Sequence, residues 1–266
     1  MTLRSRTKAL YGRARNIGAK VDFFIVGVQK GGTTALDRVL RDSPGVQMPD
    51  RKEIHFFDDE RRDWSKPDYR DLHRRFDWTV AGVRRGEATP IYSYWPGALE
   101  RLADYNPDAR IVLSLRHPAF RAHSHWRMEA KRGDETLSFG AAIRGGRERV
   151  GARHRVFSYV ERGFYAPQIR RIQALFDRVH VIRCDRMWSD FRPTLRGLCA
   201  FLGAPSHPRE RRYVAPVETR SMAPIRREDL DHLSDLYAED IRETAALTGL
   251  DLDDRLDRDY AEPMPR

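Results

Sequence analysis

Cysteine is scarce in this sequence. Its 266 residues include only two cysteines, Cys184 and Cys199, and they do not form a CxxC pair. Two cysteines cannot build the disulfide framework of a small secreted domain. We therefore expect two buried thiols and a reducing, cytoplasmic setting.

Long apolar runs are also absent. A membrane-spanning helix needs about 20 apolar residues, whereas the longest run here is FFIVGV at 23–28, which we interpret as a buried strand. The first 20 residues carry six basic and no acidic side chains but lack the apolar core of a signal peptide. We expect a flexible basic arm over residues 1–20, with an organelle transit peptide as the alternative.

The charge balance is strongly basic. The formal net charge is +10, while 40% hydrophobic and 33% charged residues are typical of a globular chain and not of a disordered one. A basic protein favours anionic partners such as nucleotides, sulfated sugars, nucleic acids or acidic membranes. A solvated, arginine-rich surface accounts for the same excess equally well, so charge alone does not select a partner.

Strand and helix patterns alternate along the chain. We predict strands over 22–28, 110–116 and 179–184, and helices over 34–42, 118–131, 167–176, 193–202 and 227–247. A charged, variable helix-loop region is expected over 133–158. This alternation, with no internal repeat or linker, predicts one α/β domain over 21–266 in which helices flank a central parallel sheet.

A glycine-rich turn follows the first predicted strand. The segment reads FFIVGVQKGGTTAL at 23–36, so a strand runs into Lys30, Gly31 and Gly32, and Thr33 and Thr34 open a helix. Such a turn aims free backbone N–H groups and the positive end of the helix at an anion. It is therefore expected to bind a phosphate-type group.

This turn differs from the loop of nucleotide triphosphatases. Their motif reads GxxxxGK[ST], but alignment from Gly27 puts Thr33 where the lysine belongs, and Lys30 comes three residues earlier. The turn also offers no obvious carboxylate partner for magnesium. We expect phosphate binding without a metal.

The loop and four later segments resemble the sulfotransferases that use 3′-phosphoadenosine-5′-phosphosulfate (PAPS). The resemblance is nearest to the heparan-sulfate-type and bacterial carbohydrate enzymes and covers about residues 22–250. The segments that carry it, in register, are GVQKGGTTAL at 27–36, KEIHFFDDE at 52–60, GEATPIY at 86–92, SLRHPAFRAHSHW at 114–126 and GFYAPQI at 163–169.

The resemblance implies roles for the donor-binding residues. Lys30, Gly31, Gly32, Thr33 and Thr34 would hold the 5′-phosphosulfate, with Lys30 stabilising the leaving oxygens. The 3′-phosphate would lie on two further side chains, which are Arg116 at the end of a strand and Ser124 about two turns into the next helix. Arg220 falls where relatives carry a basic loop over the nucleotide, although the K-G-R of that loop is not reproduced.

The catalytic base is expected beyond the first helix. By resemblance Glu53 is the base and His55 supports it, and the reverse order stays open because cytosolic sulfotransferases use a histidine base. The heparan-type enzymes carry a lysine where this chain has Ala88, which weakens the case for a heparan-like acceptor. Glu87, the next candidate base, would line the acceptor side together with Thr89 and Tyr92.

The sequence thus predicts a metal-independent sulfotransferase that moves a sulfuryl group from PAPS to a hydroxyl or amine of a carbohydrate or small-molecule acceptor. One alternative is a P-loop kinase, which would need magnesium and a lysine at the Thr33 position. The other is a non-catalytic nucleic-acid binder. No helix-turn-helix, zinc or single-strand RNA module supports it, so we expect no nucleic-acid partner.

Overall fold

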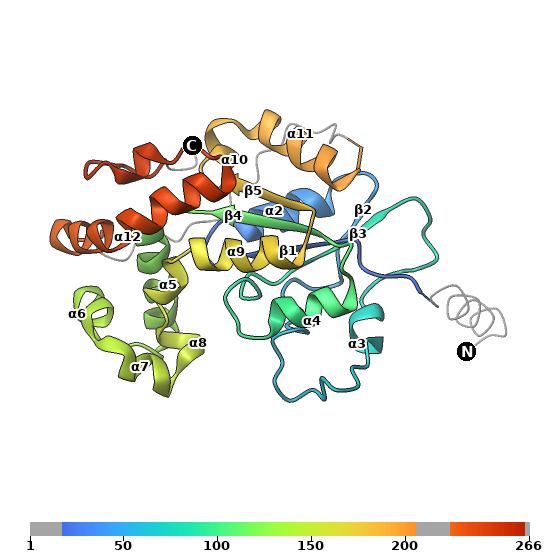
Figure 1. The fold of residues 1–266 in the computed structure, drawn as a ribbon, viewed down its shortest axis with the longest axis horizontal. Coiled ribbons are helices and arrows are strands. Elements are labelled where there is room, and N and C mark those ends of the chain that lie inside the picture. The colour runs from blue at the N-terminus through green and yellow to red at the C-terminus, as the bar shows by residue number, and fades with distance from the viewer. Residues whose placement is uncertain (1–17, 206–223, 264–266) are drawn as a thin grey trace.

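A five-stranded parallel sheet forms the centre of the protein. The structure is a computed structural model and describes residues 18–205 and 224–263. The strands run in the order β2-β3-β1-β4-β5 (Figure 1). Their bounds are Phe23–Gly27 for β1, Val46–Gln47 for β2, Arg84–Ala88 for β3, Arg110–Leu115 for β4 and Val179–Arg183 for β5.

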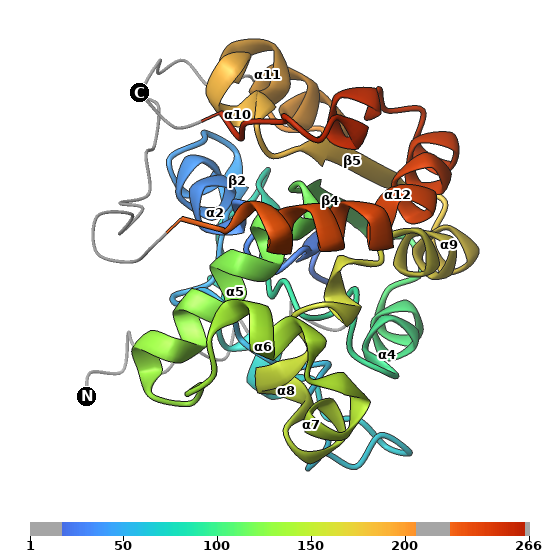
Figure 2. The same ribbon diagram turned by 90° about the vertical axis from the view of Figure 1, so that its left-hand side faces the viewer.

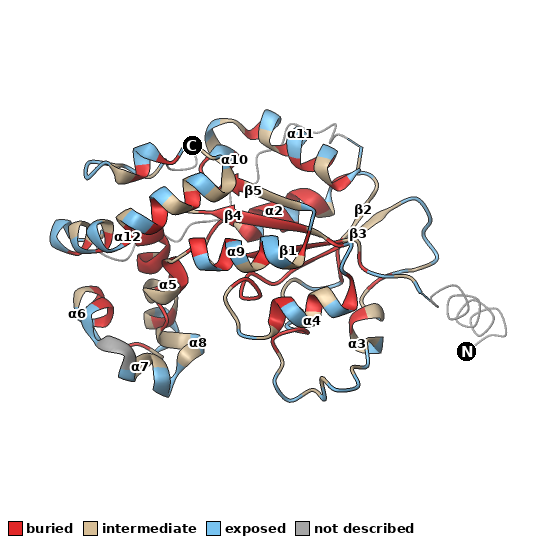
Figure 3. Ribbon diagram, viewed as in Figure 1, coloured by how far each residue is buried: buried red, intermediate tan, exposed pale blue. Residues whose placement is uncertain are grey.

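Helices cover both faces of the sheet. Successive residues of β1 point to opposite faces, so Phe23 and Ile25 pack on one side and Phe24 and Val26 on the other. The first side carries α2 (Thr33–Arg41), α10 (Arg186–Ser189) and α11 (Phe191–Leu202), and the second carries α3 (Arg70–His73), α4 (Ala98–Tyr105) and α9 (Ala166–Leu175). All five residues of β1 are buried, and Figure 3 shows the red strands enclosed by these helices. This sandwich confirms the predicted α/β class.

A third apolar cluster lies beside the sheet, in a group of helices after β4. Its members are Ala119 and Ala122 of the long helix α5 and residues of later helices, among them Phe139, Leu233 and Tyr237. The helices and 3-10 turns of this region are α5 (Pro118–Arg132), α6 (Phe139–Arg144), α7 (Gly146–Ala152), α8 (His154–Phe157), η1 (Glu161–Gly163), α12 (Arg227–Thr248) and η2 (Asp253–Leu256). Figure 2 shows α12 lying across α5.

Local signals in the sequence set several of these boundaries. Pro118 occupies the first turn of α5, where its missing N–H costs nothing, and the His117 side chain accepts a hydrogen bond from the Ala119 N–H. Gly133 and Gly203 adopt left-handed conformations at the ends of α5 and α11. The predicted strands and the five predicted helices are confirmed to within a few residues, and the 133–158 region forms short helices.

Two strands and three helices were missed, namely β2, β3, α3, α4 and α10. The β3 sequence RRGEA contains no β-branched or aromatic residue, so it lacks the usual signature of a strand. It forms a strand because it pairs with β1 on one side and β2 on the other. Within the described ranges, no helix is both long and apolar enough to cross a membrane.

We predict that Gly86→Ala destabilises the protein. A Cβ built at Gly86 in β3 would come within 1.9 Å of the Phe23 ring, which is fully buried in β1. Overpacking of this kind costs about 1–3 kcal/mol, which a urea unfolding midpoint would measure. Gly197→Ala in α11 is the matched control, because a Cβ there meets nothing within 4 Å. Equal midpoints for Gly86→Ala and the parent protein would contradict the prediction.

Candidate functional site

The glycine-rich loop lies against the end of the neighbouring strand β4. The Val28 N–H donates to the Ser114 carbonyl at 3.1 Å, and the Ser114 hydroxyl donates to the Gly31 carbonyl at 2.6 Å. A Cβ at Gly31 would come within 2.3 Å of the Ser114 carbonyl oxygen, so only glycine allows this approach. Gly32 then takes a left-handed conformation (φ 80°) and caps α2, whose first residues are Thr33 and Thr34. The loop therefore lies at the carboxyl edge of the sheet, where α/β proteins bind ligands.

Lys30 projects from this loop toward α5. Its Nζ lies 3.9 Å from the Met128 sulfur, and its backbone is left-handed, with φ of 70°. Burial lowers the pKa of Lys30 to about 8, and the positive charges of Arg116 and Arg132 add to this effect. The ammonium group is thus held among other cations, in a position that an incoming anion would stabilise.

The predicted 3′-phosphate residues lie on the next strand and helix. Arg116 immediately follows β4, and its Nη1 donates to the Lys30 carbonyl at 3.3 Å. The other side of its guanidinium faces the carboxylate of Glu262, near the end of the chain. Ser124 is half-buried in the second turn of α5, as the spacing predicted. The predicted Arg220 lies outside the described residues.

The segment that carries the predicted base has an unusual backbone. Glu53 and His55 have positive φ angles of 61° and 55°, which side chains other than glycine rarely adopt. Three hydrogen bonds from the end of β3 hold this segment. The Glu53 N–H donates to the Ala88 carbonyl at 3.2 Å, the Ile54 N–H to the Glu87 carboxylate at 3.2 Å, and the His55 N–H to the Thr89 hydroxyl at 3.4 Å.

The expectation that Glu87, Thr89 and Tyr92 line the acceptor side is wrong. All three side chains are completely buried beneath the 53–57 segment. The Tyr92 hydroxyl accepts hydrogen bonds from the backbone N–H groups of Phe56 and Phe57, at 2.9 and 3.4 Å. Burial raises the pKa of Glu87 to about 7, against the hydrogen bonds from Thr89 and Ile54. Glu87, Thr89 and Tyr92 therefore support the segment from behind, by accepting hydrogen bonds from its backbone N–H groups.

Glu53 and His55 form a charged pair at the surface of the site. The His55 Nε2 lies 3.5 Å from a Glu53 carboxylate oxygen, and both side chains are about two-fifths exposed. Burial raises the pKa of Glu53, but the hydrogen bond from His55 and the charge of Lys52 outweigh it and lower the pKa to about 2. Hydrogen bonds to Asp58 and Glu53 raise the pKa of His55 to about 9. At neutral pH the pair is therefore a carboxylate beside an imidazolium.

Asp58 extends this pair into a chain of charges, and the sequence analysis did not single it out. Its buried carboxylate lies 2.9 Å from His55 Nδ1 and 2.6 Å from Arg155 Nη1. The guanidinium of Arg155 also covers the Trp95 ring, at 3.8 Å from the centroid. The spacing of Asp58, three residues after His55, was a usable signal. No local signal pointed to Arg155, which is 97 residues away from Asp58.

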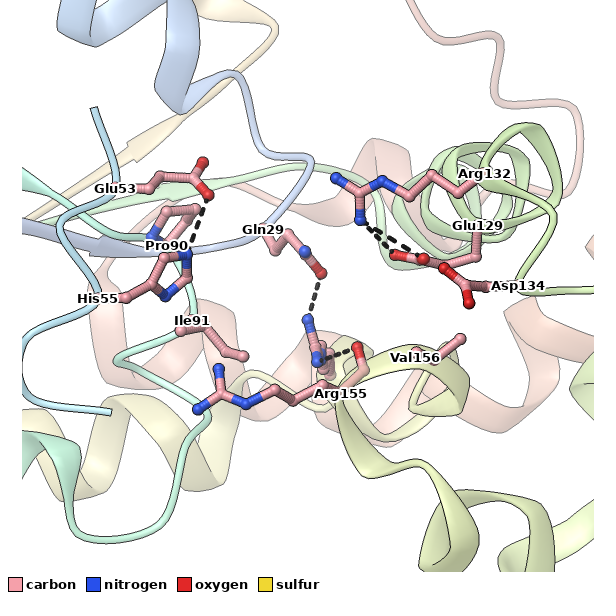
Figure 4. A pocket seen from close by; sticks show the side chains of 11 residues that line it. Gln29, Glu53, His55, Pro90, Ile91, Glu129, Arg132, Asp134, Arg155 and Val156 are labelled. Atoms are coloured by element: carbon pink, nitrogen blue, oxygen red, sulfur yellow. Dashed lines mark hydrogen bonds and ion pairs between the residues drawn. The ribbon is translucent and has the colours of Figure 1, made fainter. Parts of the chain in front are cut away.

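A pocket of about 320 Å³ opens in front of these groups (Figure 4). Glu53 and His55 form one wall, Gln29 of the glycine-rich loop lies between the walls, and Glu129 and Arg132 of α5 form the opposite wall. The pocket therefore joins the predicted base to the loop that carries Lys30. In the described parts of the chain, no group of three or more His, Cys, Asp or Glu side chains is arranged to hold a metal ion.

Arg162 is a second lining residue that the sequence analysis missed. It precedes the GFYAPQI segment, is 3% exposed, and donates to the Gln29 side-chain oxygen, to Ser158 Oγ at 2.8 Å and to the Arg155 carbonyl at 2.9 Å. Since these acceptors are neutral, its charge is not balanced by an ion pair with them. Burial and the charge of Arg121 lower the pKa of Arg162 to about 9. The guanidinium adds a fixed positive charge behind the glycine-rich loop.

Comparison with known proteins agrees with this arrangement. A sequence profile of the family described as "Sulfotransferase domain" matches residues 20–239. The chain is similar to heparan sulfate glucosamine 3-O-sulfotransferase 6 of Mus musculus, with 32% identity over 185 residues, which cover 67% of this chain and 51% of the relative. It spans about half the length of the curated relatives it matches.

Solved structures show the same similarity. A sulfotransferase from Alicyclobacillus acidocaldarius matches with a TM-score of 0.74 and 31% identity, covering 89% of this chain and 99% of that one. Mouse sulfotransferase SULT7A1, solved in complex with PAP, shares the fold alone, with a TM-score of 0.51 and 16% identity over 86% of this chain and 87% of its own. The family match also favours the sulfotransferase interpretation over the kinase one. With a profile match over most of its length, the chain belongs to the sulfotransferase family.

Proposed function

We propose that the protein transfers a sulfuryl group from PAPS to a hydroxyl or amine of a carbohydrate or small-molecule acceptor. The observation that carries the proposal is the pocket in which Glu53 faces the glycine-rich loop. Family membership supports PAPS as the donor. The cytoplasmic setting stays a prediction, based on the scarcity of cysteine and on the burial of both Cys184 and Cys199.

The donor's two anionic ends would bind at neighbouring points on the sheet edge. The backbone of Gly31 and Gly32 and the hydroxyls of Thr33 and Thr34 suit the 5′-phosphosulfate, since they open α2 at its positive end. Arg116 suits the 3′-phosphate, because a guanidinium can donate two parallel hydrogen bonds to it. Ser124 and Arg220 would complete the 3′-phosphate site, by resemblance.

The reaction is an in-line displacement at sulfur. The acceptor oxygen or nitrogen forms a bond to sulfur as the bond from sulfur to the 5′-phosphate oxygen breaks, and 3′-phosphoadenosine-5′-phosphate (PAP) leaves. The acceptor proton goes to Glu53, and Lys30 stabilises the negative charge on the leaving phosphate. Alignment of both reactants in one pocket removes much of the entropy cost.

The protonation states favour Glu53 as the base over His55. With a pKa near 2, Glu53 is ionised at neutral pH, whereas His55, with a pKa near 9, already carries its proton. Such an acidic carboxylate is a weak base in isolation. The His55 imidazolium and Lys52 would hold the Glu53 carboxylate in place. The negative charge of a bound donor would raise the pKa of Glu53 and make it a stronger base.

We predict that the protein binds PAP more tightly than 5′-AMP, because only PAP carries a 3′-phosphate. Arg116→Ala should lose about 1.5–3 kcal/mol of PAP binding, the worth of a charge-assisted hydrogen bond, and should leave AMP binding little changed. Isothermal calorimetry measures both. Arg70→Ala is the control, since that side chain is 90% exposed and pairs with Asp68. Equal affinities for PAP and AMP would remove the assignment of a 3′-phosphate site.

We predict that Glu53→Gln lowers turnover by about 10²–10⁴-fold, the usual contribution of a general base. PAP affinity should barely change, because Glu53 faces the acceptor pocket. His55→Ala should reduce turnover less, and Lys30→Ala should impair both turnover and PAPS binding. A nearly active Glu53→Gln beside an inactive His55→Ala would make histidine the base. The control is Glu239→Gln, an exposed carboxylate on α12.

We predict that sulfuryl transfer persists in EDTA. Thr33 replaces the lysine of the metal-nucleotide loop, and Lys30 is expected to meet the leaving charge in its place. Steady-state rates with and without chelator, on enzyme dialysed free of divalent ions, test this. A strict requirement for added magnesium would contradict it.

A further inference from the structure

A carboxylate of the protein itself engages the guanidinium assigned to the 3′-phosphate. Arg116 Nε donates to one oxygen of Glu262 at 2.6 Å, and Arg116 Nη2 donates to the other oxygen. Both side chains are largely buried, with 21% of Arg116 and 13% of Glu262 exposed. The pair has the two-pronged geometry by which arginine also binds phosphate.

The C-terminal segment after α12 brings Glu262 to this position. Arg255 in η2 is buried and donates to the Leu115 carbonyl at 3.0 Å, so η2 is anchored at the end of β4. Tyr260 then stacks on His117, with ring centroids 4.9 Å apart and planes 18° apart. Figure 2 shows this red segment running back from α12 past β5 toward α10. The segment therefore crosses the sheet edge where the donor is proposed to bind.

We propose that Glu262 is an internal competitor of the donor, a carboxylate that occupies the 3′-phosphate position on Arg116 until PAPS displaces it. This rests on the proposed function, since it takes Arg116 as a donor residue. The two ligands exclude each other because the Nε and Nη2 donors of Arg116 can face only one anion. A Glu262 left buried without Arg116 would be costly, so the tail has to move outward as the nucleotide enters.

The anchoring of the segment makes this exchange local. Six residues separate Glu262 from Arg255, a fully buried residue of η2. Arg255 stays bound to the Leu115 carbonyl and to Asp185. Only the stretch from Asp257 to Glu262 needs to move. The tail then raises the apparent dissociation constant of PAPS and PAP alike, since both carry the 3′-phosphate, and it leaves ligands without that group unaffected.

The test compares PAP and AMP binding to the full chain and to Glu262→Gln, by calorimetry. Glutamine keeps the size of the side chain but removes the charge that competes for Arg116. PAP should bind roughly tenfold more tightly to Glu262→Gln, which corresponds to about 1.4 kcal/mol, while AMP affinity stays the same. Glu239→Gln, which removes an exposed carboxylate from α12, should change neither affinity.

Two further variants support the test. In an Arg116→Ala background, Glu262→Gln should give no gain in PAP affinity, because Glu262 is expected to act only through Arg116. Tyr260→Ala should give a smaller gain of the same sign by loosening the stack on His117. Thermal unfolding of each variant reports whether the fold is intact.

The outcomes separate this inference from the proposed function. If PAP binds better than AMP and needs Arg116, but Glu262→Gln changes nothing, Glu262 does not compete and the proposed function stands. If Glu262→Gln tightens PAP and AMP equally, the tail covers the nucleotide site as a whole, and competition at the 3′-phosphate position is refuted. If PAP binds no better than AMP to any variant, including Glu262→Gln, the proposed donor site itself fails.

Discussion

The close approach between the glycine-rich loop and the end of β4 is the constraint on which the site depends. Because Gly31 lies directly on the Ser114 carbonyl, the loop and β4 share one edge of the sheet. That contact sets Lys30 beside Arg116, whose guanidinium donates to the Lys30 carbonyl. Two cationic residues, one in the loop after β1 and one at the end of β4, therefore lie at the same edge of the sheet, which is where α/β proteins bind ligands.

The segment that carries the proposed base depends on a second constraint, which lies in the buried end of β3. Glu53 and His55 hold left-handed backbone conformations, which cost free energy unless the surroundings enforce them. Ala88, Glu87 and Thr89 hold them in place by accepting hydrogen bonds from the backbone N–H groups of the segment. The buried Glu87 thus supports the segment, and Glu53, which is partly exposed, faces the pocket. This division accounts for the presence of two glutamates with opposite pKa shifts within one site.

Most of the fold could be predicted because its central strands are apolar and its helices carry local stop signals. The apolar runs of β1 and β4, with glycine or proline at the boundaries, suffice to place them. The polar strand β3 could not be found in this way, because its conformation comes from pairing with β1 and β2. Of the site, the glycine-rich loop, Arg116 and the Glu53–His55 pair were predicted, since each lies in a short segment with its own chemical signature.

The sequence by itself determined which chemical groups the site contains and where along the chain each would appear. Only the tertiary structure decided which of them meet. Three hydrogen-bonded pairs of the site join residues that are far apart in the sequence. They are Asp58 with Arg155, 97 residues apart, Gln29 with Arg162, 133 apart, and Arg116 with Glu262, 146 apart. Such contacts leave no periodic or local pattern, because they arise when the sheet brings loop ends together and the later helices pack over them. The partner of each charged group is therefore a property of the folded chain.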